Sequence, residues 1–241
     1  VVGPRNDNQE VRSGGIAGQN EKGTIKFSYN HNNVGGQNKD TIYSNMSGGI
    51  VGFNNAGKIQ NCGNFGNVFA KSRNESKMNQ GAFAGGICAY NNRGTVSACF
   101  NDNSNGVYEL TEQNRIASVT QIYAYTTFSS MDIFVGGLVG YNENGSKIQT
   151  SYSISNIQYD LGGTSATAHI GGIVGQNNAV YMDLGNGLRC YALSESQVES
   201  AGETFQANAN VYAYTYLNFN DFVESLANAL GVTTISEIKY E

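Results

Sequence analysis

The sequence predicts an all-β protein built as a right-handed parallel β-helix (β-solenoid) of about five repeats, closed by a short C-terminal capping helix. Three observations predict this fold: a short phrase recurs five times, apolar and polar residues alternate in short runs, and Pro4 is the only proline among 241 residues. Proline would interrupt the ladders of backbone hydrogen bonds that a continuous sheet needs. The chain is therefore expected to form a single repeat domain over residues 1–241.

The repeated phrase begins with Gly-Gly, continues with Ile or Leu, and ends in Asn. It starts at Gly14, Gly48, Gly85, Gly136 and Gly171, so the successive spacings are 34, 37, 51 and 35 residues. A recurring period of this length is typical of architectures in which each repeat stacks on the previous one. The repeats are expected to extend over 14–210, with the third repeat enlarged by an insertion within 107–134.

Each phrase is followed by a second block with a period of two, clearest from Gly57 to Val68. This alternation favours strands over helices. Strands one period apart can stack as parallel ladders about 4.8 Å apart, with either one or two coils per repeat. Inward-facing side chains are expected at two slots, which hold Ile16, Ile50, Ile87, Leu138 and Ile173 within the phrase and Ile25, Ile59, Val96 and Ile148 after it.

The Asn that ends each phrase is expected to occupy one corner at every level of the stack. These residues are Asn20, Asn54, Asn91, Asn142 and Asn177. Asn tolerates left-handed backbone and can hydrogen-bond to the Asn above and below. A structural role is therefore favoured over ligand binding.

The cysteines are interpreted as structural. Cys62 and Cys99 fall at one slot of adjacent repeats, where other repeats carry Ser28 and Ser151. Exchange with serine is typical of a small buried residue, and free thiols are favoured over a disulfide or a catalytic role. Because the chain has no Cys-x-x-Cys pair and no His at zinc-finger spacing, no metal or other cofactor is expected.

Two aromatic strings depart from the repeat and are the places where specific contacts are expected. The first lies in the enlarged repeat and the second begins the tail over 211–241, which continues into a helix from Asp221 to Leu230 that is expected to cap the stack. The tyrosines either pack across strands or form a stacking platform for a sugar or a partner protein. The candidate ligand-contact residues are Tyr123, Tyr125, Tyr212, Tyr214 and Tyr216.

Charge and hydropathy exclude several classes of partner. The net charge of −5 comes from scattered residues, with no run of like charges. Nucleic acid and an anionic membrane surface both call for clustered Lys and Arg, so neither is expected as a partner. No stretch approaches the roughly 18 apolar residues that insertion into a bilayer requires.

The chain is expected not to be an enzyme. His31 and His169 stand outside any recognisable catalytic or zinc-binding motif. The alternative is a polysaccharide-degrading β-helix enzyme, a lyase or a glycosidase, which would need carboxylates that converge in space. In the sequence the acids stand singly, as Asp102, Asp132, Asp160 and Asp183.

The segment Gly137-Leu138-Val139-Gly140-Tyr141-Asn142 resembles the GLUG motif, and the stretch from Gly48 through Val68 is similar to it with Ile50 in place of Leu. The resemblance covers roughly half of the chain. It implies a secreted or cell-surface bacterial β-helix that acts in adhesion or as a structural stalk, with a host or microbial glycan or protein as partner. It carries no catalytic residues, because the motif contains none.

Overall fold

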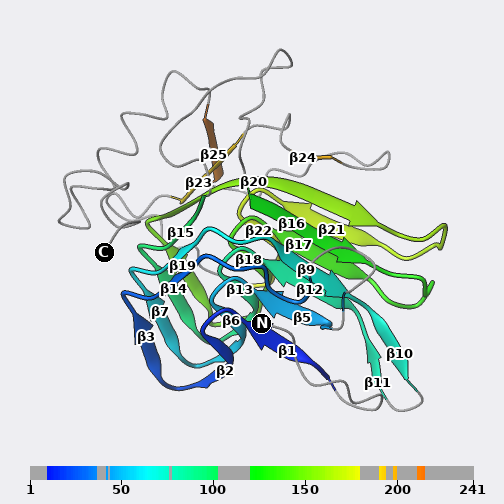
Figure 1. Cartoon of the computed structure of the whole chain (residues 1–241), viewed down its shortest axis with the longest axis horizontal. Coiled ribbons are helices and arrows are strands. Elements are labelled where there is room, and N and C mark those ends of the chain that lie inside the picture. Colours follow the sequence, from blue (N-terminus) through cyan, green and yellow to red (C-terminus); the bar gives the residue numbers. More distant parts are fainter. Residues whose placement is uncertain are drawn as a thin grey trace.

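Strands from successive repeats lie side by side and parallel, so that the chain forms stacked levels (Figure 1). The computed structural model describes residues 10–36, 42, 44–75, 78–102, 120–179, 190–193, 198–199 and 211–214. These residues contain strands and turns but no helix. The protein is therefore all-β, as predicted, while the helix expected from Asp221 to Leu230 lies outside the described residues.

The first two sheets come from the repeated phrase itself. The first sheet contains β1 (Arg12–Gly14), β5 (Met46–Gly48), β12 (Ala82–Gly85), β17 (Ile133–Gly136) and β21 (Ala168–Gly171). The second sheet contains β2 (Ala17–Glu21), β6 (Val51–Asn55), β13 (Cys88–Asn92), β18 (Val139–Asn142) and β22 (Val174–Asn177). In both sheets the order of the strands follows the order of the repeats.

The next block of each repeat supplies the third and fourth sheets. The third sheet contains β3 (Thr24–Lys26), β7 (Lys58–Gln60), β14 (Thr95–Ser97) and β19 (Lys147–Gln149). The fourth contains β4 (Tyr29–Asn30), β8 (Gly63–Asn64), β9 (Val68–Lys71), β15 (Phe100–Asp102), β16 (Thr120–Tyr125), β20 (Ser151–Asp160), β23 (Cys190–Leu193), β24 (Val198–Glu199) and β25 (Val211–Tyr214). An antiparallel hairpin of β10 (Arg73–Glu75) and β11 (Met78–Gln80) branches from the second repeat.

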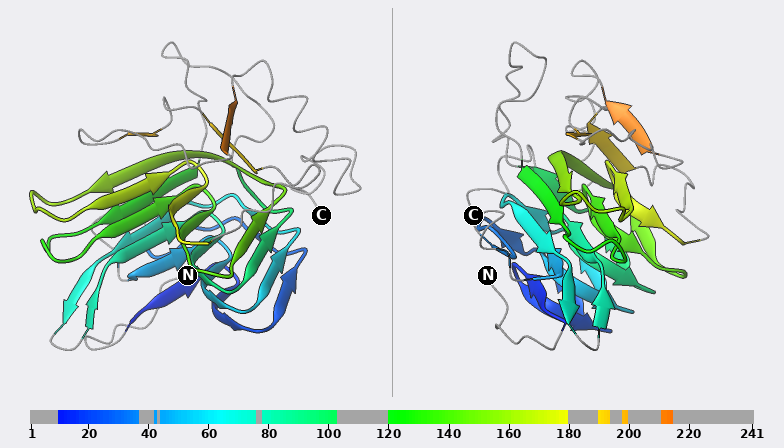
Figure 2. Two further views of the ribbon diagram at one scale, coloured as in Figure 1. Left: turned by 180° about the vertical axis from the view of Figure 1, so that it is seen from behind. Right: turned by 90° about the vertical axis from the view of Figure 1, so that its right-hand side faces the viewer.

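The register shows how many levels one repeat occupies. Gly14 pairs with Gly48, and Gly48 pairs with Gly85, so equivalent residues of adjacent repeats lie directly beside each other. One repeat therefore makes one level, which decides between the one-coil and two-coil alternatives. Figure 2 shows the levels from two further sides, with the first repeats (blue) at the bottom and the later ones (green and yellow) above.

Two hydrophobic clusters fill the space between the sheets. The first contains Ile50, Ile87, Leu138 and Ile173 from the phrase together with Ile59, Val96 and Ile148, all buried as predicted. The second joins the first sheet to β9, β16 and β20 through alternating apolar side chains such as Ala84, Ile122 and Ile157. Ile16 differs from the other members of this slot because it is 46% exposed, although its backbone N–H donates to the carbonyl oxygen of Ile50 in the same register. It belongs to the first described level and has a neighbouring level on one side only.

At two corners of a level the chain turns through a single residue in the left-handed region, except after β18, where a longer turn contains Gly145 with a φ of +80°. Lys22, Ala56 and Arg93 turn the chain from the second sheet into the third, with φ near +55°. Phe27, Asn61, Ala98 and Thr150 turn it from the third into the fourth. Non-glycine residues adopt this conformation at a cost of about 1–2 kcal/mol. The stacked levels impose the turn even on the β-branched Thr150, where φ is +44°.

Candidate functional site

The Asn residues that end each phrase form a continuous hydrogen-bonded ladder. Asn54 donates from Nδ2 to Oδ1 of Asn91 at 2.8 Å, and Asn91 donates to Asn142 at 2.9 Å. The ladder continues at its two ends to Asn20 and Asn177. Its middle members are fully buried. The expected hydrogen bonds between successive Asn residues are confirmed. The expected corner position is wrong, because these Asn residues belong to strands and the left-handed corner residue comes two positions later, at Lys22, Ala56 and Arg93.

A second Asn ladder was missed by sequence reasoning. Asn30 donates to Asn64, and Asn64 donates to Asn101, each over 2.8 Å between Nδ2 and Oδ1. Asn101 in turn donates to the hydroxyl of Ser153 at 3.1 Å. The signal was present in the sequence, because each of these Asn residues follows a phrase-ending Asn by ten positions.

The cysteine slot lies in the first hydrophobic cluster. Cys62, Cys99 and Cys190 are buried free thiols, and Cys190 pairs in register with Ser151. A hydrogen bond from the Cys99 thiol lowers the pKa of Cys62, whereas burial raises the pKa of Cys99 well above its usual value. Burial also raises the pKa of Cys190 to about 12. These thiols are packing residues, as expected from their exchange with serine.

Alkaline pH should destabilise the fold through Cys88. Burial raises the pKa of this thiol from 9.0 to about 12, so between these values the unfolded chain loses a proton that the folded chain keeps. The free energy of unfolding should therefore fall across this window by about 1.4 kcal/mol per pH unit for this one group. In urea titrations at several pH values, Cys88→Val should make this fall shallower by that amount, because valine has no thiol to ionise. Valine fits the site, since the register partners of Cys88 are Val51 and Val139. Parallel pH profiles for the two proteins would contradict this account.

The surface feature with the clearest capacity for binding is a double column of aromatic rings where the first and second sheets meet. We call it the aromatic corner; its rings belong to Phe53, Phe83, Tyr90, Phe134 and Tyr141. Phe83 and Phe134 stack at 4.8 Å between ring centroids, and Tyr90 lies 4.8 Å from Tyr141. The columns also touch each other, since Tyr141 meets Phe134 edge to face at 5.2 Å. Most of these rings are only half-buried.

Small residues of the phrase bring the two sheets close enough for these contacts. A Cβ placed on Gly140 would lie 2.9 Å from the carbonyl oxygen of Ala84 in the first sheet. Ala89 takes the equivalent place in the third repeat, where it is fully buried and packs with Met46 and Phe83. Because Ala89 replaces glycine in that copy of the phrase, its methyl group adds a contact with Met46 and Phe83 beneath the rings.

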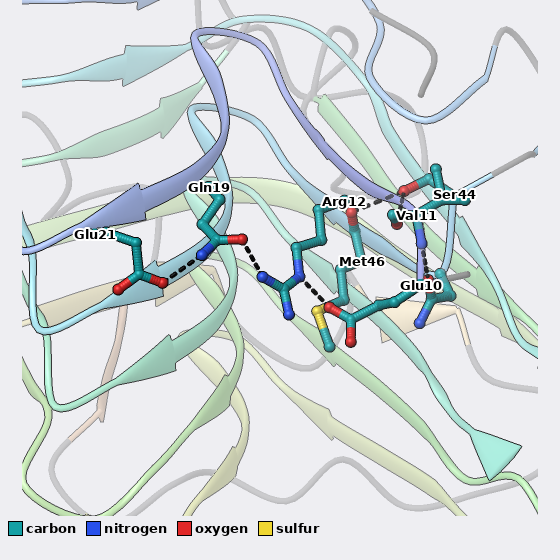
Figure 3. Close-up of polar contacts among 8 residues, drawn as sticks. Glu10, Val11, Arg12, Gln19, Glu21, Ser44 and Met46 are labelled. Atoms are coloured by element: carbon teal, nitrogen blue, oxygen red, sulfur yellow. Dashed lines mark hydrogen bonds and ion pairs between the residues drawn. The ribbon is translucent and has the colours of Figure 1, made fainter. Parts of the chain in front are cut away.

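A polar network lies beside Phe53 at one end of the aromatic corner. Figure 3 shows its hydrogen bonds. The Arg12 guanidinium lies between Glu10 and Gln19 and donates to both side chains, and Gln19 donates to Glu21. The same guanidinium sits 4.2 Å above the ring centroid of Phe53. Such a cation contributes to the packing of an aromatic face that it covers.

Polar partners also surround the other end. His169 stacks on Phe134 at 4.7 Å, and its Nε2 lies 3.6 Å from a carboxylate oxygen of Asp132. The Tyr90 hydroxyl donates to Glu143 at 2.7 Å. Burial, followed by this hydrogen bond and the charge of Glu143, raises the pKa of Tyr90. The corner thus offers an apolar strip with hydroxyl, amide and carboxylate groups along its borders.

The tyrosines predicted as ligand contacts lie elsewhere. Tyr123 is buried against Ile42 and Phe69 on the outer side of β16, and Tyr125 is half-buried with the Lys71 ammonium 5.4 Å from its ring. Tyr212 and Tyr214 belong to β25, which pairs in parallel with β23. Tyr216 lies outside the described residues. Ligand binding at these five residues stays a prediction.

Each of the single acids in the described structure has a partner of its own. Tyr152 donates to the buried Asp102 at 3.1 Å, Asp132 faces His169, and Asp160 accepts from the backbone of Gly162. Asp183 lies outside the described residues. Within the described ranges, no three His, Cys, Asp or Glu residues gather in an arrangement suited to a metal ion.

Comparison with known proteins finds no match to a family model, to a curated protein or to a solved structure. The described part of the chain contains no helix that is both long and apolar enough to cross a membrane. The class of this protein is therefore defined by its own structure. It is an all-β repeat protein with stacked parallel sheets, and it carries the aromatic corner on its surface.

Proposed function

We propose that this chain is a non-catalytic module of a secreted or cell-surface bacterial protein, and that it acts in adhesion. In this proposal the GLUG-type repeats form a right-handed parallel β-helix, and the segment from Asp221 to Leu230 caps its last level. The in-register stacking of one repeat per level supports such a scaffold. The Asn side chains that hydrogen-bond from one level to the next carry no charge. They keep the levels in register, so the scaffold can hold a binding surface in a fixed position.

The observation that carries the adhesive role is the half-exposed aromatic corner. Contiguous apolar patches on a protein surface commonly mark contact sites, and aromatic rings bordered by polar groups suit a sugar, which has apolar C–H faces and hydroxyl edges. Here the rings of Tyr90 and Tyr141 stand beside the acceptor Glu143 and the amide of Asn178. The ligand of this corner is accordingly proposed to be a host or microbial glycan.

A glycan array with the full chain tests this function. Tyr141→Ala should lower binding at least tenfold, whereas Tyr141→Phe keeps the ring and should lose much less. Tyr125→Ala and Tyr214→Ala test the predicted tyrosines separately. Absence of array binding, or binding untouched by Tyr141→Ala in a protein with an unchanged circular-dichroism spectrum, would overturn adhesion at this corner and favour a structural stalk.

A further inference from the structure

The outer side of the third sheet collects positive charge that is dispersed in the sequence. Ile25, Ile59, Val96 and Ile148 point inward from the middle of β3, β7, β14 and β19, so the flanking residues of each strand point outward. Together with the corner that precedes each strand, these outward positions include five exposed cations. We call this surface the basic face; its cations are Lys22, Lys26, Lys58, Arg93 and Lys147.

The stacking sets the spacing of these charges. Lys58 pairs in register with Thr95, and Thr95 pairs with Lys147. Two levels of a parallel sheet therefore separate the two lysines, a distance of roughly 10 Å along the stack. Lys26 occupies the neighbouring column, beside Gln60. The third sheet lies at the lower left of Figure 1, away from the strands that carry the first sheet.

Acids are missing from this surface over the four described levels. The segments 22–28, 56–62, 93–99 and 144–151, which form the third sheet and its two corners, contain five Lys or Arg and no Asp or Glu. Two acids border the surface just before these segments: Glu21 accepts from Gln19 and Asn55, and Glu143 accepts from Tyr90. These donors are uncharged, so both carboxylates keep their negative charge. Five cations and these two bordering acids leave a local charge of +3 in a chain of net charge −5, which is a separation of charge. Such a separation attracts anionic partners at physiological ionic strength.

The residues between the cations indicate which anionic polymer fits. Thr24, Thr95, Ser97, Gln60 and Gln149 give the face short hydroxyl and amide groups, which can hydrogen-bond to sugar hydroxyls and ring substituents. Single-stranded nucleic acid would call for a row of aromatic stacking platforms, whereas Phe27 is the one aromatic residue in these four segments. A membrane surface would call for several apolar residues that insert beside the charges, whereas Phe27 is the only large exposed apolar residue in these four segments.

We propose that the basic face binds an anionic polysaccharide, with the Lys and Arg side chains on its sulfate or carboxylate groups. The bound chain runs along the stack, across β3, β7, β14 and β19, so that each level contributes at least one cation to the same polymer. This surface is separate from the aromatic corner, and the proposal does not depend on the ligand of that corner.

Heparin serves as the probe, with neutral dextran as the uncharged control, in isothermal titration with the full chain at several salt concentrations. The double variant Lys58→Gln, Lys147→Gln should weaken heparin binding at least tenfold and reduce the salt dependence of the affinity, because fewer counterions are released. Lys71→Gln is the matched control, since it removes a single positive charge from β9, where the ammonium faces Tyr125. It should change the affinity less than twofold.

Several results would overturn the proposal. The first is an absence of heparin binding at low salt, and the second is heparin binding that the double variant leaves intact. The third is a loss of heparin affinity in Lys71→Gln that equals, per charge removed, the loss in the double variant, because this would indicate attraction to net charge alone. Tighter binding of a single-stranded oligonucleotide than of heparin would assign the face to nucleic acid instead. Because Tyr141→Ala should leave heparin binding unchanged, failure of this proposal and failure of adhesion at the aromatic corner can be told apart.

Discussion

Replacing Asn91 with alanine should lower the free energy of unfolding by about 4 kcal/mol, since an unsatisfied buried polar group costs about 1–3 kcal/mol. Asn91 accepts from Asn54 and donates both to Asn142 and to the carbonyl oxygen of Gly94, and its side chain is fully buried. Its removal leaves all three partners without this bond. Urea unfolding of the full chain, followed by circular dichroism, measures the loss.

Asn92 is the matched control for this substitution. It is the next residue of the same strand, and its amide donates to Asn55 at 2.9 Å on the partly exposed side of the sheet. Water can replace this bond, so Asn92→Ala should cost about 1 kcal/mol or less. Equal losses in the two variants would contradict the assignment of stability to the buried ladder.

Gly86→Ala should be a severely damaging methyl addition, with a loss of more than about 4 kcal/mol or no folded protein at all. A Cβ at this position would lie 2.1 Å from the carbonyl oxygen of Gly137 and 2.4 Å from Cγ of Asn101. Neither group can move freely, because the first belongs to the next level and the second to the buried Asn ladder. The second glycine of the phrase is therefore required by the close approach of two levels.

Gly163→Ala separates this steric effect from backbone strain. Gly163 has a φ of +75°, but no atom lies within 4 Å of the position that its Cβ would take. The expected cost is about 1 kcal/mol, from backbone conformation alone. Thermal unfolding of both variants checks the contrast, and a Gly86→Ala protein as stable as Gly163→Ala would show that adjacent levels can move apart.

Much of the core could be predicted from the sequence because it depends on residues at equivalent places in each repeat. The Ile or Leu of the phrase and the Asn that ends it recur at readable spacings. The apolar residues are buried from Ile50 to Ile173, and the Asn residues hydrogen-bond to one another as expected. The exposure of Ile16 could not be predicted, because a repeat pattern carries no information about which level lies at an end. The enlarged repeat was located, and its described portion contains β16, but the residues 103–119 lie outside the described structure.

The candidate surfaces could not be predicted in the same way. Phe83 and Tyr141 are far apart in the chain and belong to different sheets, and only the angle between those sheets brings their rings within 6.1 Å. The cations of the basic face are dispersed along the sequence, where a search for runs of like charge finds none. Stacking places Lys58 and Lys147 two levels apart.

By itself the sequence determined the repeating unit, the strand character, and the buried Ile and Asn slots, because periodicity along a chain dictates which side chains share a face. The tertiary structure decided that one repeat makes one level, that a second Asn ladder accompanies the first, and that aromatic rings and cations gather on separate surfaces. These features depend on register and on the angles between sheets, which arise only when the levels pack against one another.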